Sequence, residues 1–224
     1  MKLVIFDVDG TLMNSQAMII ASLTAAFAGE KLPLPDRNAM LSIVGLSLFN
    51  AMQTLRPDDE EAVHHSLAER YKKAFWAYRE GKAHAELPYE GALEALRRLK
   101  ARNDVALGIA TGKSQRGVRH IVDQFGLEGV FSTIQTSDDA PSKPHPAMIL
   151  QAMDAVGADR EDTVMIGDAV FDMEMAQAAG VHGIGVSWGF QPVERLQAAG
   201  ARTILGDYSE LDGALDSLWQ DRAA

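Results

Sequence analysis

The run Leu3-Val4-Ile5-Phe6-Asp7-Val8-Asp9-Gly10-Thr11 decides the fold of this chain. Its first four residues are all apolar, which is typical of a strand buried on both faces within a parallel sheet. Two carboxylates follow at once, and burying their charge costs free energy unless a partner compensates it. Asp7 and Asp9 therefore either turn and cap the chain after the strand or belong to an active site at its end.

The composition is that of an acidic globular protein. Of the 224 residues, 47% are hydrophobic and 23% are charged, so a sizeable core is possible. The net charge of −10 argues against nucleic acid or an anionic membrane surface as a partner. The chain has no cysteine, which excludes disulfides, Cys-based zinc sites and thiol nucleophiles. No apolar stretch reaches the ~18–20 residues of a membrane span, and the N-terminus has no secretory pattern, so we expect a cytoplasmic protein.

The sequence after the first strand divides into two unlike parts. Helical segments follow one another to about Gly81 without a convincing strand, and a loop at 44–47 interrupts them. From Tyr89 onward helices and strands alternate, which indicates a doubly wound parallel sheet. We therefore predict an α/β fold with a Rossmann-like core domain and an α-helical cap domain inserted after the first strand. The predicted core comprises residues 1–14 and 85–224, and the predicted cap comprises residues 15–84. The strands expected in the core are 3–6, 105–110, 130–135, 163–166, 183–186 and 202–205.

Polar residues follow four of these strands. In open α/β sheets, ligands bind beyond the carboxyl ends of the strands, so we expect these residues to meet at one edge. They are Asp7 and Asp9 after the first strand, Thr111-Gly112-Lys113-Ser114 after the strand at 105–110, Lys143 in the loop beyond 130–135, and Gly167-Asp168 after 163–166, with Asp172 one helical turn later.

This set of side chains favours phosphoryl chemistry. Two like charges 4 Å apart cost about 4 kcal/mol at an effective dielectric constant near 20, and a divalent cation would relieve that repulsion. Oxygen ligands without a His or Cys pattern indicate Mg²⁺ rather than zinc. Lys143, Thr111 and the amides near Gly112 would suit a phosphate. Each residue alone also has a structural reading, as a cap, a turn or a solvated lysine. Their ordered combination indicates phosphoryl transfer to a carboxylate nucleophile.

These residues, taken in order, resemble the four motifs of the haloacid dehalogenase-like hydrolases. The motifs are Asp7-Val8-Asp9-Gly10-Thr11, then Thr111, then Lys143, and finally Gly167-Asp168 with Asp172. The resemblance covers essentially the whole chain, including the helical cap. It implies that Asp7 is the nucleophile that forms an aspartyl-phosphate, and that Asp9 is first the general acid and then the general base. Asp9 also favours a phosphatase over a dehalogenase, because an ester oxygen needs a proton on departure and a halide does not.

The resemblance implies roles for the other residues as well. Asp7, Asp168 and the main-chain carbonyl of Asp9 would hold Mg²⁺, and Asp172 would orient Lys143 or a metal-bound water from a second shell. Lys143 would neutralise the nucleophile and the phosphate. The expected phosphate-binding residues are Gly10, Thr111, Gly112 and Lys143.

Three further segments resemble those of the phosphoglycolate phosphatase group. They are residues 110–114, 44–47 and 186–190. They imply a small phosphorylated metabolite similar to 2-phosphoglycolate as substrate. Gly45 and Ser47 are candidates for substrate contact from the cap, although their loop is equally a simple turn between helices.

The same motifs leave other functions open. Within the superfamily these are a pyrophosphatase, a sugar-phosphate phosphatase and a phosphomutase, the last disfavoured because the loop at 44–48 has no Arg or Lys. A non-enzymatic phospho-receiver module is a remote alternative, since a receiver has no helical insertion. We expect a monomer or a homodimer, with Trp76 either in packing or on a dimer face. His64 and His65 are expected to be solvated on a polar helix.

Overall fold

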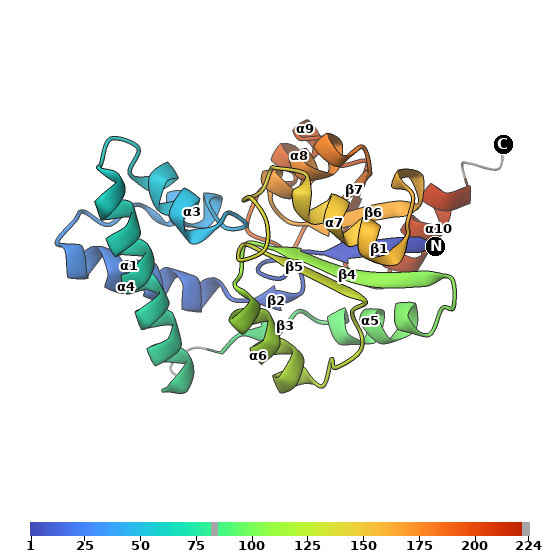
Figure 1. Cartoon of the computed structure of the whole chain (residues 1–224), viewed down its shortest axis with the longest axis horizontal. Helices are drawn as coiled ribbons and strands as arrows, with labels where there is room; N and C mark the ends of the chain where they lie inside the picture. Colours follow the sequence, from blue (N-terminus) through green and yellow to red (C-terminus); the bar gives the residue numbers. More distant parts are fainter. Residues whose placement is uncertain (82–84, 221–224) are drawn as a thin grey trace.

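The computed structural model describes residues 1–81 and 85–220. Residues 82–84 of the predicted cap and 221–224 of the predicted core lie outside the described residues. Six parallel strands form one sheet in the order β5-β4-β1-β6-β7-β8, and helices cover both of its faces (Figure 1). The predicted doubly wound α/β fold is confirmed. The strands are β1 Lys2–Phe6, β4 Val105–Thr111, β5 Thr133–Thr136, β6 Thr163–Gly167, β7 His182–Val186 and β8 Thr203–Leu205.

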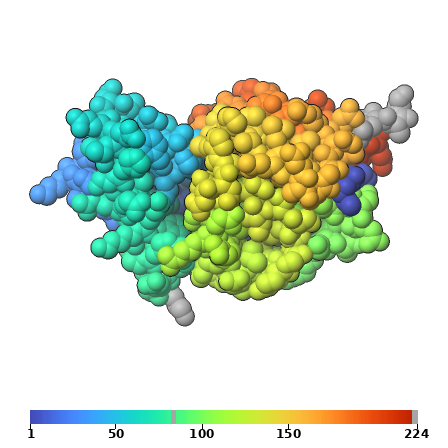
Figure 2. Space-filling view, viewed as in Figure 1, coloured from blue at the N-terminus to red at the C-terminus, as the bar shows by residue number. Residues whose placement is uncertain are grey.

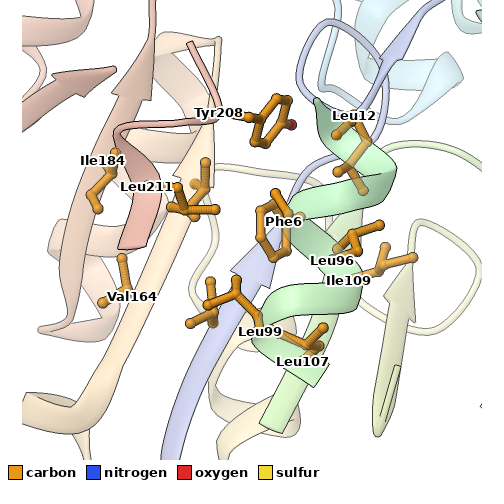
Figure 3. Packing of buried hydrophobic residues seen from close by; sticks show 14 of the residues in the cluster. Phe6, Leu12, Leu96, Leu99, Leu107, Ile109, Val164, Ile184, Tyr208 and Leu211 are labelled. Carbon is orange, nitrogen blue, oxygen red and sulfur yellow. The ribbon is translucent and has the colours of Figure 1, made fainter. Parts of the chain in front are cut away.

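Strand β1 lies inside the sheet and is buried on both faces, as its unbroken apolar run predicts. Val4 and Phe6 pack on one side with helices α5 (Ala92–Lys100), α6 (Gln115–Phe125) and α10 (Leu211–Gln220). Figure 3 shows Phe6 close to α5 and below Tyr208. Leu3 and Ile5 pack on the other side with α7 (Ala147–Val156) and α8 (Val170–Ala179). The sheet is therefore the middle layer of three, and β1 has little freedom to move.

The helices between β1 and the rest of the sheet form a second hydrophobic cluster of their own. They lie to one side of the sheet in Figure 1, and we call residues 15–81 the cap. Its helices are α1 Gln16–Glu30, α2 Arg37–Ser42, α3 Leu48–Leu55 and α4 Glu61–Glu80. Asp36 starts α2 by accepting a hydrogen bond from the amide of Ala39 at 2.9 Å, an ordinary N-cap. The domain boundaries at 14/15 and 84/85 stay a prediction.

Two short strands at the base of the cap were not predicted. Strand β2 (Met13–Asn14) pairs antiparallel with β3 (Leu87–Pro88), where the chain leaves the core and returns to it. Two residues are too few to show an alternating pattern in sequence. The remaining elements are the 3₁₀ turn η1 Arg160–Asp162 and helix α9 Val193–Ala198. None of the helices in the described ranges combines the length and apolar character needed to cross a bilayer.

Candidate active site

The strand order brings three predicted site residues to one edge of the sheet. Asp7 directly follows β1, and its amide donates to the carbonyl of Ile166 in β6 at 2.9 Å. Thr111 is the last residue of β4, and Asp168 directly follows β6. Because β4 and β6 flank β1 on either side, the three side chains meet at the carboxyl end of β1. All three are almost fully buried.

Lys143 reaches the same edge from the loop before α7. Its side chain is fully buried, and its Nζ lies 3.0 Å from Asp7 Oδ1. The same Nζ donates to Asp172 Oδ1 at 2.6 Å. Asp172 is fixed in turn, because its Oδ2 accepts a hydrogen bond from the amide of Ala169 at the start of α8. The ammonium is therefore held between two carboxylates, one of them anchored to a helix start.

The buried charges shift one another's pKa values. Burial raises the pKa of Asp7 to about 6, although Lys143 acts in the opposite direction. Burial, reinforced by the charges of Asp7 and Asp172, also raises the pKa of Asp168 well above its usual range. Burial alone would lower the pKa of Lys143, but the carboxylates of Asp172 and Asp7 raise it to about 12. The Lys143 ammonium thus stays charged. This single positive charge does not offset the cost of burying the carboxylates of Asp7 and Asp168.

The acidic cluster fits a hard divalent cation. Carboxylate oxygens of Asp7, Asp168 and Asp172 lie within 4.8 Å of one another, and all three residues are buried. Asp7 Oδ2 is buried and accepts no hydrogen bond from any described residue. Buried oxygens without a donor are rare unless an ion, a water or a ligand satisfies them, and Mg²⁺ prefers oxygen donors. Both oxygens of Asp172 accept hydrogen bonds, from Lys143 and from the amide of Ala169, whereas Asp7 keeps Oδ2 without a donor among the described residues. Asp7 and Asp168 as direct metal ligands stay a prediction.

Asp168 is held rigidly. Its Oδ1 accepts from Thr11 Oγ1 at 3.0 Å, and its Oδ2 accepts from the amide of Phe190 at 2.8 Å. Gly10 has φ +87°, and a Cβ at that position would lie 2.2 Å from Asp168 Oδ2. Only glycine fits there, so the glycine after Asp9 lets the chain pass close to the neighbouring carboxylate.

Thr111 keeps a donor for a ligand. Its Oγ1 accepts a hydrogen bond from the amide of Lys113 at 3.3 Å, which leaves the hydroxyl proton to point elsewhere. Gly112 touches the cap, because a Cβ there would lie 2.4 Å from the carbonyl oxygen of Leu46 and 2.6 Å from that of Gly45. This close approach gives Gly112 a packing role besides the predicted phosphate contact.

The cap loop that contains Gly45 and Ser47 lies against the core. The amide of Ser47 donates to Ser142 Oγ at 2.8 Å, and its side chain caps α3. Gly45 and Ser47 both line a cavity of about 530 Å³ that also reaches Asp7, Asp9 and Thr111. The loop is therefore both a turn between helices and a wall of this cavity, and direct contact with substrate stays a prediction.

Sequence reasoning missed a row of charges beside Asp9. Lys113 Nζ lies 3.0 Å from Asp9 Oδ1 and 3.1 Å from Glu86 Oε1, and Glu86 forms an ion pair with Arg79 of α4. The side chains of Lys113, Glu86 and Arg79 are nearly buried. Lys113 belongs to a strand-end motif that the sequence did single out. Nothing in the sequence pattern connects Arg79 and Glu86 with it.

The prediction for His64 was wrong. His64 is 3% exposed, and its Nε2 lies 2.7 Å from the carbonyl oxygen of Arg56, whereas His65 is exposed as expected. The Trp76 ring contacts the guanidinium groups of Arg79 and Arg116 within the chain, and it lines the cavity.

Comparison with known proteins agrees with this geometry. Residues 4–186, which include every predicted site residue, match the family described as haloacid dehalogenase-like hydrolase. The probable phosphatase IndB of Dickeya dadantii is 34% identical over 220 residues, covering 96% of this chain and 94% of that protein. A pyrophosphatase PpaX of Bacillus pumilus is 33% identical, with 86% of each chain covered. A phosphoglycolate phosphatase of Rhodospirillum rubrum is 29% identical, covering 94% of this chain and 89% of that protein.

The fold is also shared with a solved structure. The crystal structure of a hydrolase from Pseudomonas syringae superimposes with a TM-score of 0.85 at 26% identity. The match covers 97% of this chain and 99% of the other, so the core and the helical insertion both have counterparts there.

Proposed function

The chain belongs to the haloacid dehalogenase-like hydrolases and is a phosphatase, and we propose that it hydrolyses small phosphate monoesters through a phosphoryl group carried on Asp7, with Mg²⁺ as cofactor. The observation that carries the proposal is the state of the Asp7 carboxylate. One of its oxygens is paired with Lys143, and the other is buried without a hydrogen-bond donor among the described residues. An unengaged carboxylate oxygen beside a fixed ammonium suits a nucleophile for a phosphate.

The proposed reaction has two steps. In the first, a carboxylate oxygen of Asp7 forms a bond to phosphorus, the bond to the ester oxygen breaks, and Asp9 donates a proton to that oxygen. In the second, Asp9 takes a proton from water as the water oxygen attacks phosphorus, which releases phosphate and restores the Asp7 carboxylate. The two transfers return Asp9 to its starting form, as a general acid–base requires.

The surrounding residues serve these steps. Lys143 offsets the charge of the nucleophile and the phosphoryl group, and the Thr111 hydroxyl donates to a phosphoryl oxygen. Lys113 fixes the orientation of Asp9 through the contact of 3.0 Å. Asp7, Asp168 and the carbonyl of Asp9 would hold Mg²⁺, which when bound supplies the positive charge that lets phosphate approach an anionic carboxylate.

The proposed substrate is a small phosphorylated metabolite similar to 2-phosphoglycolate. The loop and tail segments of the sequence and the phosphoglycolate phosphatase among the relatives support it. Pyrophosphate is a second candidate, because another relative is named as a pyrophosphatase. A sugar-phosphate phosphatase and a phosphomutase remain alternatives. Membership of an enzyme family argues against the alternative that the chain is a non-enzymatic phospho-receiver module. A cytoplasmic location and a monomer or homodimer stay predictions.

The test is phosphate release from 2-phosphoglycolate, pyrophosphate and hexose phosphates, each with Mg²⁺ or with EDTA. We expect Mg²⁺-dependent release that Asp7→Asn abolishes and that Asp154→Asn, an exposed change in α7, leaves intact. Near-normal rates in Asp7→Asn would disprove the covalent mechanism. Turnover of one sugar phosphate isomer alone would disprove the 2-phosphoglycolate assignment.

A further inference from the structure

The cavity beside the catalytic residues continues into the cap, where its wall is apolar. It opens on Asp7, Asp9 and Thr111 at the core and measures about 530 Å³. Clefts of roughly 300–1,000 Å³ hold drug-sized ligands, so this space exceeds what a two-carbon acid fills. The cap residues that line it and are partly exposed include Leu46, Leu48, Phe49 and Trp76, and the nearly buried ring of Phe75 lies beside them.

The cavity is not a gap between separated halves, because the cap touches the core on both sides of it. On one side the amide of Ser47 donates to Ser142 Oγ at 2.8 Å, and Gln191 Nε2 donates to the carbonyl oxygen of Ser42 at 3.2 Å. On the other side Arg79 of the cap is linked through Glu86 to Lys113 of the core. Figure 2 shows cap and core atoms meeting along their join. The cavity therefore lies beside contacts that already join the cap to the core, and it is open to solvent.

Of the cations that line this cavity, Lys113 is paired and nearly buried, whereas Lys72 and Arg116 are exposed to solvent. Lys113 is paired with Asp9 and Glu86, and Lys72 is paired with Glu69 at 2.8 Å. Arg116 is exposed, and its Cζ lies 3.7 Å from the centre of the Trp76 ring. A negative charge placed beside Leu48, Phe49 and Trp76 would meet apolar side chains. An uncharged group would lose little on entering the cavity and would gain from burial.

We propose that the enzyme also accepts phosphate esters whose leaving group is an uncharged, ring-bearing alcohol, and that the ring occupies the apolar part of the cavity between α1, α3 and α4. This inference rests on the proposed phosphatase function and adds a second class of substrate to the 2-phosphoglycolate-like one. Phe75 and Trp76 offer aromatic surface for such a ring. Leu48, the first residue of α3, lines the same space and is half-buried.

The test compares 2-phenylethyl phosphate, ethyl phosphate and 2-phosphoglycolate. The first two are esters of primary alcohols with similar intrinsic reactivity, so their kcat/KM ratio reports recognition of the ring. Burial of a phenyl group predicts a preference of about tenfold to a hundredfold for 2-phenylethyl phosphate over ethyl phosphate. Leu48→Trp fills the cavity and should remove most of that preference. The matched control is Leu34→Trp, at a cap residue 47% exposed and outside the cavity, which should keep it.

Several results would overturn the inference. A kcat/KM for ethyl phosphate equal to that for 2-phenylethyl phosphate would do so. An unchanged preference in Leu48→Trp, with its fold verified by thermal unfolding, would show that the ring binds elsewhere. If Leu48→Trp does not fold, Leu48→Phe serves the same purpose. Turnover of 2-phosphoglycolate alone would leave the phosphatase function standing and refute only the cavity assignment. No Mg²⁺-dependent release from any ester would refute both.

Discussion

Replacing Asp7 by Asn should abolish turnover and, in the absence of metal, make the fold more stable. Burial raises the pKa of Asp7 from 3.8 to about 6, so the native state binds this proton more tightly than the unfolded chain does. A shift of about two pKa units, at about 1.4 kcal/mol each, corresponds to about 3 kcal/mol by which the ionised carboxylate destabilises the native state. Asparagine carries no charge and removes this cost.

The sign of the effect fixes its pH dependence. Below about pH 4 Asp7 is protonated in both states and contributes nothing. As the pH rises from about 4 to about 6 the wild type loses stability relative to Asp7→Asn, and above about 6 the difference stays constant, at about 3 kcal/mol at most.

Urea unfolding in EDTA at about pH 4, 6 and 8 measures this difference. Asp154→Asn, an exposed change in α7, should stay within about 0.5 kcal/mol of the wild type throughout. A variant Asp7→Asn that is less stable than the wild type at about pH 8, or a difference that does not change with pH, would refute the account of Asp7 as a buried, undercompensated carboxylate.

Three further predictions test the residues around Asp7. Lys143→Met leaves two buried carboxylates without their ammonium, so it should lower the free energy of unfolding by about 3–5 kcal/mol and kcat by at least about a hundredfold; unchanged kcat would contradict the role of Lys143. Gly10→Ala places a Cβ 2.2 Å from Asp168 Oδ2, so it should raise the Mg²⁺ concentration for half-maximal activity, whereas Gly129→Ala, with φ +70° but open space around it, should not. EDTA should abolish phosphate release, Mg²⁺ should restore it, and Asp168→Asn should need at least about tenfold more Mg²⁺; an unaltered requirement would remove Asp168 from the metal site.

The part of the site that follows the strands was predictable from sequence. Asp7, Thr111 and Asp168 each come directly after, or end, a strand with a clear apolar pattern, and the carboxyl ends of parallel strands meet at one edge. Their proximity therefore follows from the fold class alone. The pairing of Lys143 with Asp172 was expected only from the family resemblance, since both residues lie in segments whose paths the strands do not fix.

The parts that sequence did not reveal depend on how the cap folds back on the core. The ion pairs of Arg79, Glu86 and Lys113 join three segments, and in sequence Arg79 and Glu86 look like ordinary surface charges. His64 lies in a polar stretch, and its buried ring contacts the carbonyl oxygen of Arg56 just after α3, which no side-chain pattern shows. In sequence, the apolar residues around the cavity show the same helical periodicity as residues of a packed core. That periodicity does not show whether their side chains face other side chains or an open cavity.

The most direct test of the central claim is to trap the phosphoryl group on Asp7. Borohydride reduces an acyl phosphate on an aspartate to homoserine, and peptide mass spectrometry locates the reduced residue. During turnover of an accepted ester with Mg²⁺, we predict homoserine at position 7, with none when the ester or Mg²⁺ is omitted. Continued turnover with no homoserine, or with homoserine at Asp9 or Asp168 instead, would contradict Asp7 as the nucleophile.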